Sequence, residues 1–316
     1  MKSSKIIAAG KCLPRTVVDN DALSKTVDTN DDWIVSRTGI HSRRIADEET
    51  TLSMALQASK EAIEHAGIDK QTIDLILVAT ITPDTFMPST AALLQHHLGI
   101  SGHPVTAFDL NAACTGFIYA LQTAHFYIQS GQVRRALVVG SETMSKALNW
   151  EDRSTCVLFG DGAGAVVLEG AETGGIIASY TNARGDIDNH LTLSAFRATD
   201  DDALARNGGE IFKFAPFAIR DSLTAVLEQT NRSVEDLSMI IPHQANVRIL
   251  KKTAKQMGID FEKFYVNLHQ YGNTSSASIA IALAEALEEH KIHEGDLVAL
   301  TGFGGGLTWG SILHQF

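Results

Sequence analysis

Apolar and polar residues follow two patterns that occur twice along the chain, in the same order. An amphipathic stretch over 52–66, ending at Gly67, indicates a helix, and the apolar run over 74–80 is typical of a buried strand. The second half repeats this order with a helix over 216–228, where proline is acceptable in the first turn, and a strand over 236–241. Such alternation predicts βαβ units and mostly parallel sheets.

The remaining elements of the two halves also correspond. Gly99 and Gly258 each end a predicted helix and lie 159 positions apart, and the same interval separates Cys114 from Asn273. Each half continues with a strand, a long apolar helix that begins at a small-residue turn, a second strand and a glycine-rich hairpin. The predicted ranges are 105–110, 114–130, 136–140 and 159–164 in the first half, and 264–268, 274–288, 297–302 and 303–306 in the second.

The interval between the halves shortens at the hairpins. Asp161 and Gly305 are only 144 positions apart, which indicates an extra segment at about 142–155. The repeat therefore predicts an α/β fold in which two units, residues 1–173 and 174–316, form a five-layered αβαβα core.

Composition and charge limit the function. Of 316 residues, 44% are hydrophobic and 20% charged, which is ordinary for a folded enzyme. The net charge of −11 argues against nucleic acid and anionic membranes as partners. The sequence has no signal-peptide core and no apolar run of about 18 residues. The three cysteines, Cys12, Cys114 and Cys156, build neither a disulfide framework nor a metal pair, so we expect a cytoplasmic protein.

Three side chains are predicted at strand ends, where ligands gather in α/β sheets. Cys114 begins a long helix, whose N–H groups and positive end lower a thiol pKa, although a lone cysteine is also a common small core residue. His243 ends a strand, and Asn273, the repeat counterpart of Cys114, is either its partner or a helix cap. The glycines at 304–306 either admit a substrate to backbone N–H donors or form a tight hairpin.

Two further groups of residues indicate binding surfaces. A basic stripe at helical spacing is either a solvated face or a docking face for an acidic partner; it comprises Arg248, Lys251, Lys252 and Lys255, and Lys213 extends it. Trp33 and Arg37 lie at i and i+4, and with Arg153 they could sandwich a base and hold phosphate.

Metal and nucleotide cofactors are not predicted. The histidine pairs at 96–97 and 290–293 have no clear third ligand. The glycine run at 160–164 precedes a strand and has no following Gly-Lys-Ser/Thr, so it fits neither a dinucleotide fingerprint nor a P-loop.

These segments together resemble the bacterial β-ketoacyl-acyl-carrier-protein synthase III family. The motifs that carry the resemblance lie in order along essentially the whole chain, at residues 32–34, 37–40, 111–117, 159–165, 242–246, 272–275 and 303–310. The resemblance implies a thiolase-like fold, a homodimer, and an acyltransferase that starts fatty-acid synthesis. That reaction condenses an acyl-CoA primer with malonyl-acyl-carrier protein and releases CO₂ and CoA.

The resemblance also implies roles for individual residues. Cys114 would attack the acyl-CoA thioester, with the oxyanion held by the backbone N–H groups of Cys114 and Gly305. His243 and Asn273 would hydrogen-bond the malonyl thioester carbonyl and stabilise the enolate that decarboxylation leaves. The CoA contacts would be Trp33, Arg37, Arg153 and Asn246, and the carrier-protein face would comprise Lys213, Gln244, Arg248, Lys251, Lys252 and Lys255.

Two positions depart from the family pattern. Met87 stands where some members carry Phe, in the segment that lines the acyl pocket of the partner subunit, and a flexible Met predicts that branched or longer primers fit beside acetyl. Gly209 stands where Asn often contacts pantetheine, which predicts a weaker hold on that arm.

Four alternatives were weighed. A thiolase needs a second reactive cysteine in its C-terminal loop, and the stretch 301–304 has none. A related condensing enzyme of polyketide or quinolone synthesis would use the same three side chains, because fold and triad do not fix the substrate. A cysteine hydrolase would pass its acyl group to water, and a non-catalytic scaffold would leave Cys114 no more reactive than Cys12.

Overall fold

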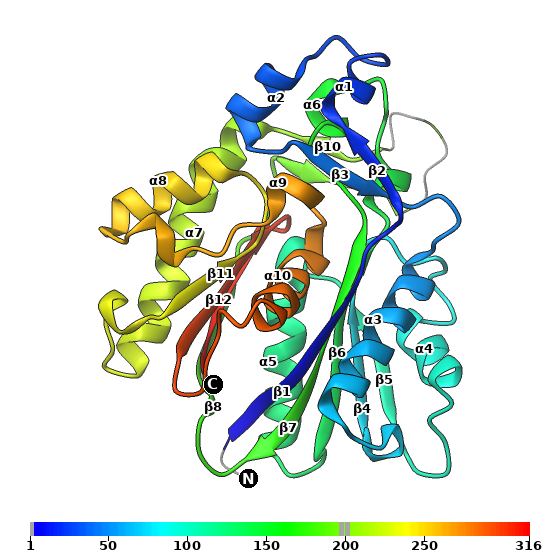
Figure 1. The fold of residues 1–316 in the computed structure, drawn as a ribbon, viewed down its shortest axis with the longest axis vertical. Coiled ribbons are helices and arrows are strands. Elements are labelled where there is room, and N and C mark those ends of the chain that lie inside the picture. Colours follow the sequence, from blue (N-terminus) through cyan, green and yellow to red (C-terminus); the bar gives the residue numbers. More distant parts are fainter. Residues whose placement is uncertain (1–2, 196–198, 200–202) are drawn as a thin grey trace.

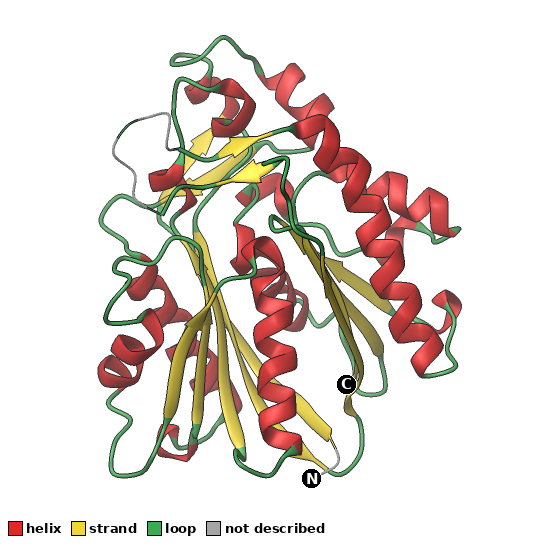
Figure 2. Cartoon of the chain, turned by 180° about the vertical axis from the view of Figure 1, so that it is seen from behind, coloured by secondary structure: helices red, strands yellow, loops and turns green. Residues whose placement is uncertain are grey.

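Two β-sheets alternate with three layers of helices in the computed structural model, which describes residues 3–195, 199 and 203–316 (Figures 1 and 2). The predicted five-layered order is confirmed. The outer layer on the first sheet is α3 (Thr51–Ala66) and α4 (Thr90–Leu98), the middle layer is α5 (Gly116–Gln129) and α10 (Ser278–Glu288), and the other outer layer is α7 (Gly208–Gln229) and α8 (Val247–Met257).

The two sheets have five and four strands, and corresponding strands of the two halves occupy the same order in both. The first is β1 (Ser3–Cys12), β7 (Gly162–Ala171), β6 (Arg135–Glu142), β4 (Leu75–Ala79) and β5 (Thr106–Leu110). The second is β8 (Gly175–Ala183), β13 (Thr308–Gln315), β12 (Leu297–Gly304) and β11 (Met239–Pro242). The corresponding pairs β4/β6 and β11/β12 are parallel, and the next strands in the chain, β7 and β13, run antiparallel to β6 and β12. The division of the chain into units at residue 174 stays a prediction.

The predicted strand at 264–268 is wrong. Only Phe264 pairs with the sheet, through a single parallel bridge to Ile240, and the chain then enters α9 (Leu268–Tyr271). The buried amide of Gln244 explains this, because it donates to the Tyr265 carbonyl (3.0 Å) and accepts from the Asn267 N–H (3.1 Å). A side chain thus occupies backbone groups that a fifth strand would have used.

Residues 143–161 join β6 to β7, whereas only 305–307 join β12 to β13. Helix α7 begins at Gly208, eight positions before the predicted start, because the Asn207 side chain caps the Glu210 N–H. Pro216 therefore lies inside the helix and not in its first turn.

Smaller elements connect the main helices and strands. The short strands and helices are β2 (Thr16–Asp19), α1 (Asn20–Leu23), α2 (Asp31–Thr38), β3 (Ser42–Ile45), α6 (Arg153–Cys156), β9 (Leu191–Thr192) and β10 (Ala205–Arg206). The 3₁₀ turns are η1 (Lys70–Thr72), η2 (Ala113–Thr115), η3 (Met144–Ala147), η5 (Val234–Asp236), η6 (Phe261–Lys263) and η7 (Ser275–Ala277).

The middle helix layer forms the centre of the core. Phe117, Leu121, Ile279 and Leu283 are fully buried between the sheets. A helix that packs on both faces has no polar stripe, which explains the apolar composition of α5 and α10. In the part of the chain that the structure describes, no helix has the length and apolar character that a membrane span requires.

Candidate active site

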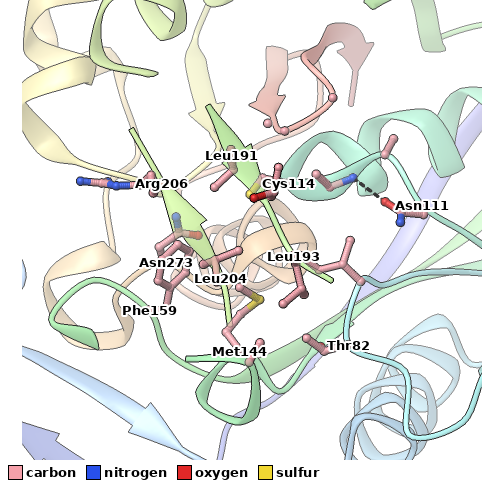
Figure 3. Close-up of a pocket in the computed structure, with 18 of the residues that line it drawn as sticks. Thr82, Asn111, Cys114, Met144, Phe159, Leu191, Leu193, Leu204, Arg206 and Asn273 are labelled. Atoms are coloured by element: carbon pink, nitrogen blue, oxygen red, sulfur yellow. Dashed lines mark hydrogen bonds between the residues drawn. The ribbon is translucent and has the colours of Figure 1, made fainter. Parts of the chain in front are cut away.

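Cys114, His243 and Asn273 line one cavity of about 730 Å³ at the carboxyl ends of the sheet strands (Figure 3). Both halves of the chain contribute to its wall. The lining is mostly apolar and includes Phe159, Leu191, Leu204 and Phe303. The three polar side chains that the sequence placed at strand ends therefore share one largely apolar site, the arrangement typical of small-molecule sites.

Cys114 lies in η2, in a turn that the second half repeats. Ala113 before it has φ +47°, and Asn111 Oδ1 accepts from the Ala113 N–H (3.1 Å, Figure 3). Ser275 likewise has φ +51°, and Asn273 Oδ1 accepts from its N–H (2.8 Å). Ala113 and Ser275, the strained left-handed residues of the two turns, therefore occupy equivalent positions in the two halves. The counterpart of Asn273 is therefore Asn111, not Cys114 as the sequence interval predicted.

The pKa of Cys114 is raised to about 12. Burial is the main cause; a hydrogen bond with Ser275 opposes the rise and the charge of Glu142 adds to it. The prediction that the helix start lowers this pKa is wrong, because desolvation of a thiolate outweighs the partial charge of a helix end.

His243 follows β11 and is buried, which lowers its pKa to about 3, so the imidazole is neutral. Its Nδ1 lies 2.7 Å from Ser278 Oγ, and its ring packs edge-on against Phe303 at 5.1 Å. When the Ser278 hydroxyl donates to Nδ1, the ring proton lies on Nε2. A neutral His243 then presents an N–H donor to the cavity.

Asn273 is held through its backbone by the segment 143–161 of the first half. Its N–H donates to Leu158 O (2.8 Å), and its carbonyl accepts from the Gly160 N–H (3.0 Å). A Cβ on Gly160 would lie 2.2 Å from Tyr271 O, so this close approach requires glycine. Because Oδ1 is bonded to Ser275, the Nδ2 amide is the end of the side chain left to donate to a ligand.

The glycine loop packs directly against the backbone of Cys114. A Cβ on Gly304 would lie 2.7 Å from the Cys114 nitrogen, whereas a Cβ on Gly305 would meet Leu191 at 3.4 Å, an ordinary contact distance. The structure thus brings Cys114 and the predicted oxyanion residue Gly305 together.

The predicted CoA residues gather outside the cavity, except for Asn246, which lines it. The guanidinium carbons of Arg37 and Arg153 lie 4.9 and 5.3 Å from the centre of the Trp33 ring. Arg153 also pairs with Asp28 (3.2 Å), and Asn246 Nδ2 donates to Arg37 O (2.9 Å).

Most of the predicted carrier-protein residues share one surface. The guanidinium carbon of Arg248 and the Nζ of Lys252, both on α8, lie 5.4 and 4.9 Å from the centre of the Phe212 ring on α7. Lys251 and Lys255 are exposed on the same helix, as is Lys213 on α7. Gln244 does not lie on this surface: it is 1% exposed and its amide bonds Pro242, Tyr265 and Asn267. The prediction of a docking role for Gln244 is therefore corrected to a structural one.

Met87 is 88% exposed and is not part of this chain's cavity, although its neighbour Phe86 lines it. Sequence reasoning missed two residues that support the site, Ser278 and Glu142. The signal for Glu142 was present, since it is the one acid in the apolar run over 136–142. Among the described residues, no group of three or more His, Cys, Asp or Glu could hold a metal ion.

The duplicated five-layered fold, with a cysteine, a histidine and an asparagine in one buried cavity, is that of thiolase-like condensing acyltransferases. Family models described as 3-oxoacyl-[acyl-carrier-protein] synthase III and its C-terminal region match residues 108–185 and 227–316.

Individual relatives agree over the full length. The chain is 47% identical to a β-ketoacyl-[acyl-carrier-protein] synthase III of Clostridium perfringens, covering 99% of each chain. The crystal structure of 3-oxoacyl-[acyl-carrier-protein] synthase III from Aquifex aeolicus matches with a TM-score of 0.95 at 47% identity, covering 99% of this chain and 100% of that one. A priming β-ketosynthase of the R1128 polyketide pathway matches at 34% identity with a TM-score of 0.90, covering 99% and 96%. The chain belongs to the β-ketoacyl-[acyl-carrier-protein] synthase III family, whose members are acyltransferases of fatty-acid biosynthesis.

Proposed function

We propose that this chain condenses an acyl-CoA primer with malonyl-acyl-carrier protein, giving 3-oxoacyl-acyl-carrier protein, CO₂ and CoA, the initiating step of fatty-acid synthesis. One observation carries the assignment of roles: a thiol, a neutral imidazole and an amide donor line a single buried cavity. Family membership over the whole chain supports the reaction.

In the first half-reaction, the Cys114 sulfur attacks the thioester carbonyl, and CoA leaves as the thiol, so the proton lost by Cys114 ends on the CoA sulfur. The N-terminal end of α5 stabilises the negative charge that develops on the sulfur. Backbone N–H groups of Cys114 and Gly305 stabilise the tetrahedral oxyanion. The close packing of Gly304 on the Cys114 nitrogen supports this role for the loop.

In the second half-reaction, His243 Nε2 and Asn273 Nδ2 donate to the carbonyl of the malonyl thioester. Loss of CO₂ then leaves an enolate whose oxygen both donors stabilise. The carbanion attacks the acyl carbonyl on Cys114, and the released sulfur takes a proton to restore the thiol. Neutral donors suit this step, because a buried imidazolium would be costly at a pKa of about 3.

The substrates reach Cys114 from the side of the site that carries Asn246. Trp33, Arg37 and Arg153 hold the CoA adenine and phosphate, and the adenine replaces the Arg153 guanidinium that covers the indole in the empty structure. Asn246 contacts the pantetheine arm. The acidic carrier protein docks on Lys213, Arg248, Lys251, Lys252 and Lys255, a basic surface on a chain of net charge −11.

The chain acts as a homodimer in the cytoplasm. β5 is an edge strand of the first sheet, Phe86 and Met87 are exposed, and in the dimer Met87 enters the partner's acyl pocket. A flexible Met there suits primers longer or more branched than acetyl.

The stoichiometry of CoA release tests this function against the hydrolase alternative. With acetyl-CoA alone, the account predicts one equivalent of CoA per chain and no further release. Addition of malonyl-acyl-carrier protein then gives continuous release of CoA and CO₂ in equal amounts, with 3-oxobutanoyl-carrier protein as product. Continuous CoA release without the carrier protein would overturn the proposal in favour of hydrolysis.

A further inference from the structure

Glu142 is a fully buried carboxylate next to the site, at the end of β6. Six neutral groups from two distant segments approach its oxygens. Oε2 accepts from Thr80 Oγ1, Ile81 N, Thr82 N and Thr82 Oγ1 at 2.5–3.1 Å. Oε1 accepts from Ser275 Oγ (3.1 Å) and Ser276 Oγ (2.7 Å). Six hydrogen-bond contacts on one buried carboxylate indicate that Glu142 has a specific role in the protein.

The two segments that Glu142 joins belong to opposite halves and both border the cavity. Ile81 and Thr82 line it from the first half. Ser275 belongs to the turn that Asn273 begins in the second half, and the Ser275 N–H is bonded to Asn273 Oδ1. Glu142 is therefore a bridge between the cavity wall and the turn that carries Asn273.

Ser275 and Glu142 also act on the nucleophile, in opposite directions. The Ser275 hydrogen bond lowers the pKa of the Cys114 thiol, and the charge of Glu142 raises it. A serine hydroxyl has one proton to donate. When that proton is given to Glu142, it is held away from the Cys114 sulfur, which weakens the hydrogen bond that lowers the thiol pKa.

Burial raises the pKa of the Glu142 carboxyl, and the surrounding donors oppose this rise. Two of the donors on Oε2 are backbone N–H groups, which cannot accept, and the four hydroxyls around the carboxyl can all donate to it. The arrangement is that of a carboxylate ion held by neutral donors.

We propose that Glu142 is a positioning residue for the condensation: its carboxylate holds the Ser275 proton away from Cys114 and fixes the Asn273 turn against the 80–82 segment. Cys114 is then kept as an unreactive thiol until a thioester enters the cavity and activates the sulfur. The inference rests on the proposed function, but its test measures Cys114 directly and needs no condensation activity.

Glu142→Gln removes the charge with little change in volume, and Asp161→Asn is its matched control. Asp161 is also a fully buried carboxylate, bonded to Ala46 N, Ser145 N and Ser145 Oγ, but it does not act on the Cys114 thiol. Other titratable or charged groups around the cavity remain in every variant: His243, Asp84, Lys146 and Arg206.

The measurement is the rate of Cys114 alkylation by iodoacetamide as a function of pH, resolved from Cys12 and Cys156 by peptide mapping. Glu142→Gln is expected to lower the midpoint of this profile by about one pH unit, which is roughly tenfold faster alkylation below the midpoint. Asp161→Asn leaves the midpoint at the wild-type value. Glu142→Asp keeps the charge and so keeps slow alkylation.

In the condensation assay, Glu142→Gln is expected to lower kcat at least tenfold while KM for acyl-CoA stays within about threefold, because the Asn273 turn acts after the acyl group is loaded. An unchanged alkylation midpoint in Glu142→Gln, or an equal shift in Asp161→Asn, overturns the proposal. If the wild-type chain fails to condense, the proposed function is overturned instead, and the alkylation profiles can still be interpreted.

Ser275→Ala provides a second test, which can still be carried out if the Glu142→Gln variant does not fold. The Ser275 hydrogen bond lowers the pKa of the Cys114 thiol, so loss of the hydroxyl shifts the alkylation midpoint up. A downward shift, or none, means that Ser275 does not donate to the Cys114 sulfur, and it contradicts the arrangement proposed here.

Discussion

Replacing Gly304 with alanine perturbs the nucleophile without removing any polar group. The new Cβ would lie 2.7 Å from the Cys114 nitrogen and 3.2 Å from its Cα and Cβ. The new Cβ is fixed to the backbone of residue 304 and the Cys114 nitrogen is itself a backbone atom, so no rotamer change or flexible side chain can relieve the contact. Reaching an ordinary contact distance of about 3.4 Å requires a displacement of roughly 0.7 Å.

A displacement of this size has a calculable effect on acylation. Misplacement of reacting groups by about 1 Å costs on the order of 10²-fold in rate. Loss of one oxyanion donor costs about 10²–10³-fold, or about 2.7–4 kcal/mol. We therefore expect Gly304→Ala to acylate Cys114 roughly 10²–10³ times more slowly than the wild type.

Gly305→Ala is the matched control, because it adds the same methyl group one position along and keeps its own N–H. Its Cβ would meet Leu191 at 3.4 Å, so we expect acylation within about fivefold of the wild type. The assay is rapid-quench mass spectrometry of the acetyl adduct, with circular dichroism to show that both variants are folded. Near-wild-type acylation by Gly304→Ala, or an equal loss in both variants, would refute the packing argument.

Three other predictions follow from the same site and core. His243→Ala should still form the acyl adduct but condense about 10²–10³-fold more slowly, which a single-turnover assay separates; loss of acylation itself would contradict the assigned role. Burial lowers the pKa of His125 to about 4 and those of His243 and His314 to about 3. Since the unfolded chain binds protons near pH 6.5 that the native state does not, stability is fully present above pH 6.5. It falls as pH drops towards 4, by up to about 1.4 kcal/mol per pH unit per histidine, and urea unfolding at pH 7 and 5 should show a lower midpoint at pH 5. Met87→Phe should shift primer preference towards acetyl-CoA in a competition assay, and an unchanged ranking would remove Met87 from the acyl pocket.

Much of the fold could be predicted because hydrophobic periodicity reports burial directly. The helices over 52–66 and 278–288 and the strands over 75–79 and 297–304 agree with the sequence pattern within a few residues. The strand at 264–268 could not be corrected from the pattern. Its apolar composition suits a strand, and only the buried amide of Gln244, twenty positions upstream, decides that the chain leaves the sheet.

The site could be predicted as a set of residues but not as an electrostatic environment. Strand ends and glycine turns identified Cys114, His243 and Asn273, because the topology alone brings such positions together. The pKa of Cys114 depends on desolvation, which no local pattern reveals. Glu142 takes its donors from segments 60 to 134 positions away, so its role appears only when the chain is folded.

Intact-protein mass spectrometry after brief incubation with acetyl-CoA, isobutyryl-CoA or octanoyl-CoA tests the central claim most directly. The account predicts a single acyl adduct that maps to Cys114, is absent in Cys114→Ala, and disappears when malonyl-acyl-carrier protein is added. The mass shift also ranks the primers that the cavity accepts. An adduct on Cys12 or Cys156, or no adduct on Cys114 with any of the three primers, would contradict the account.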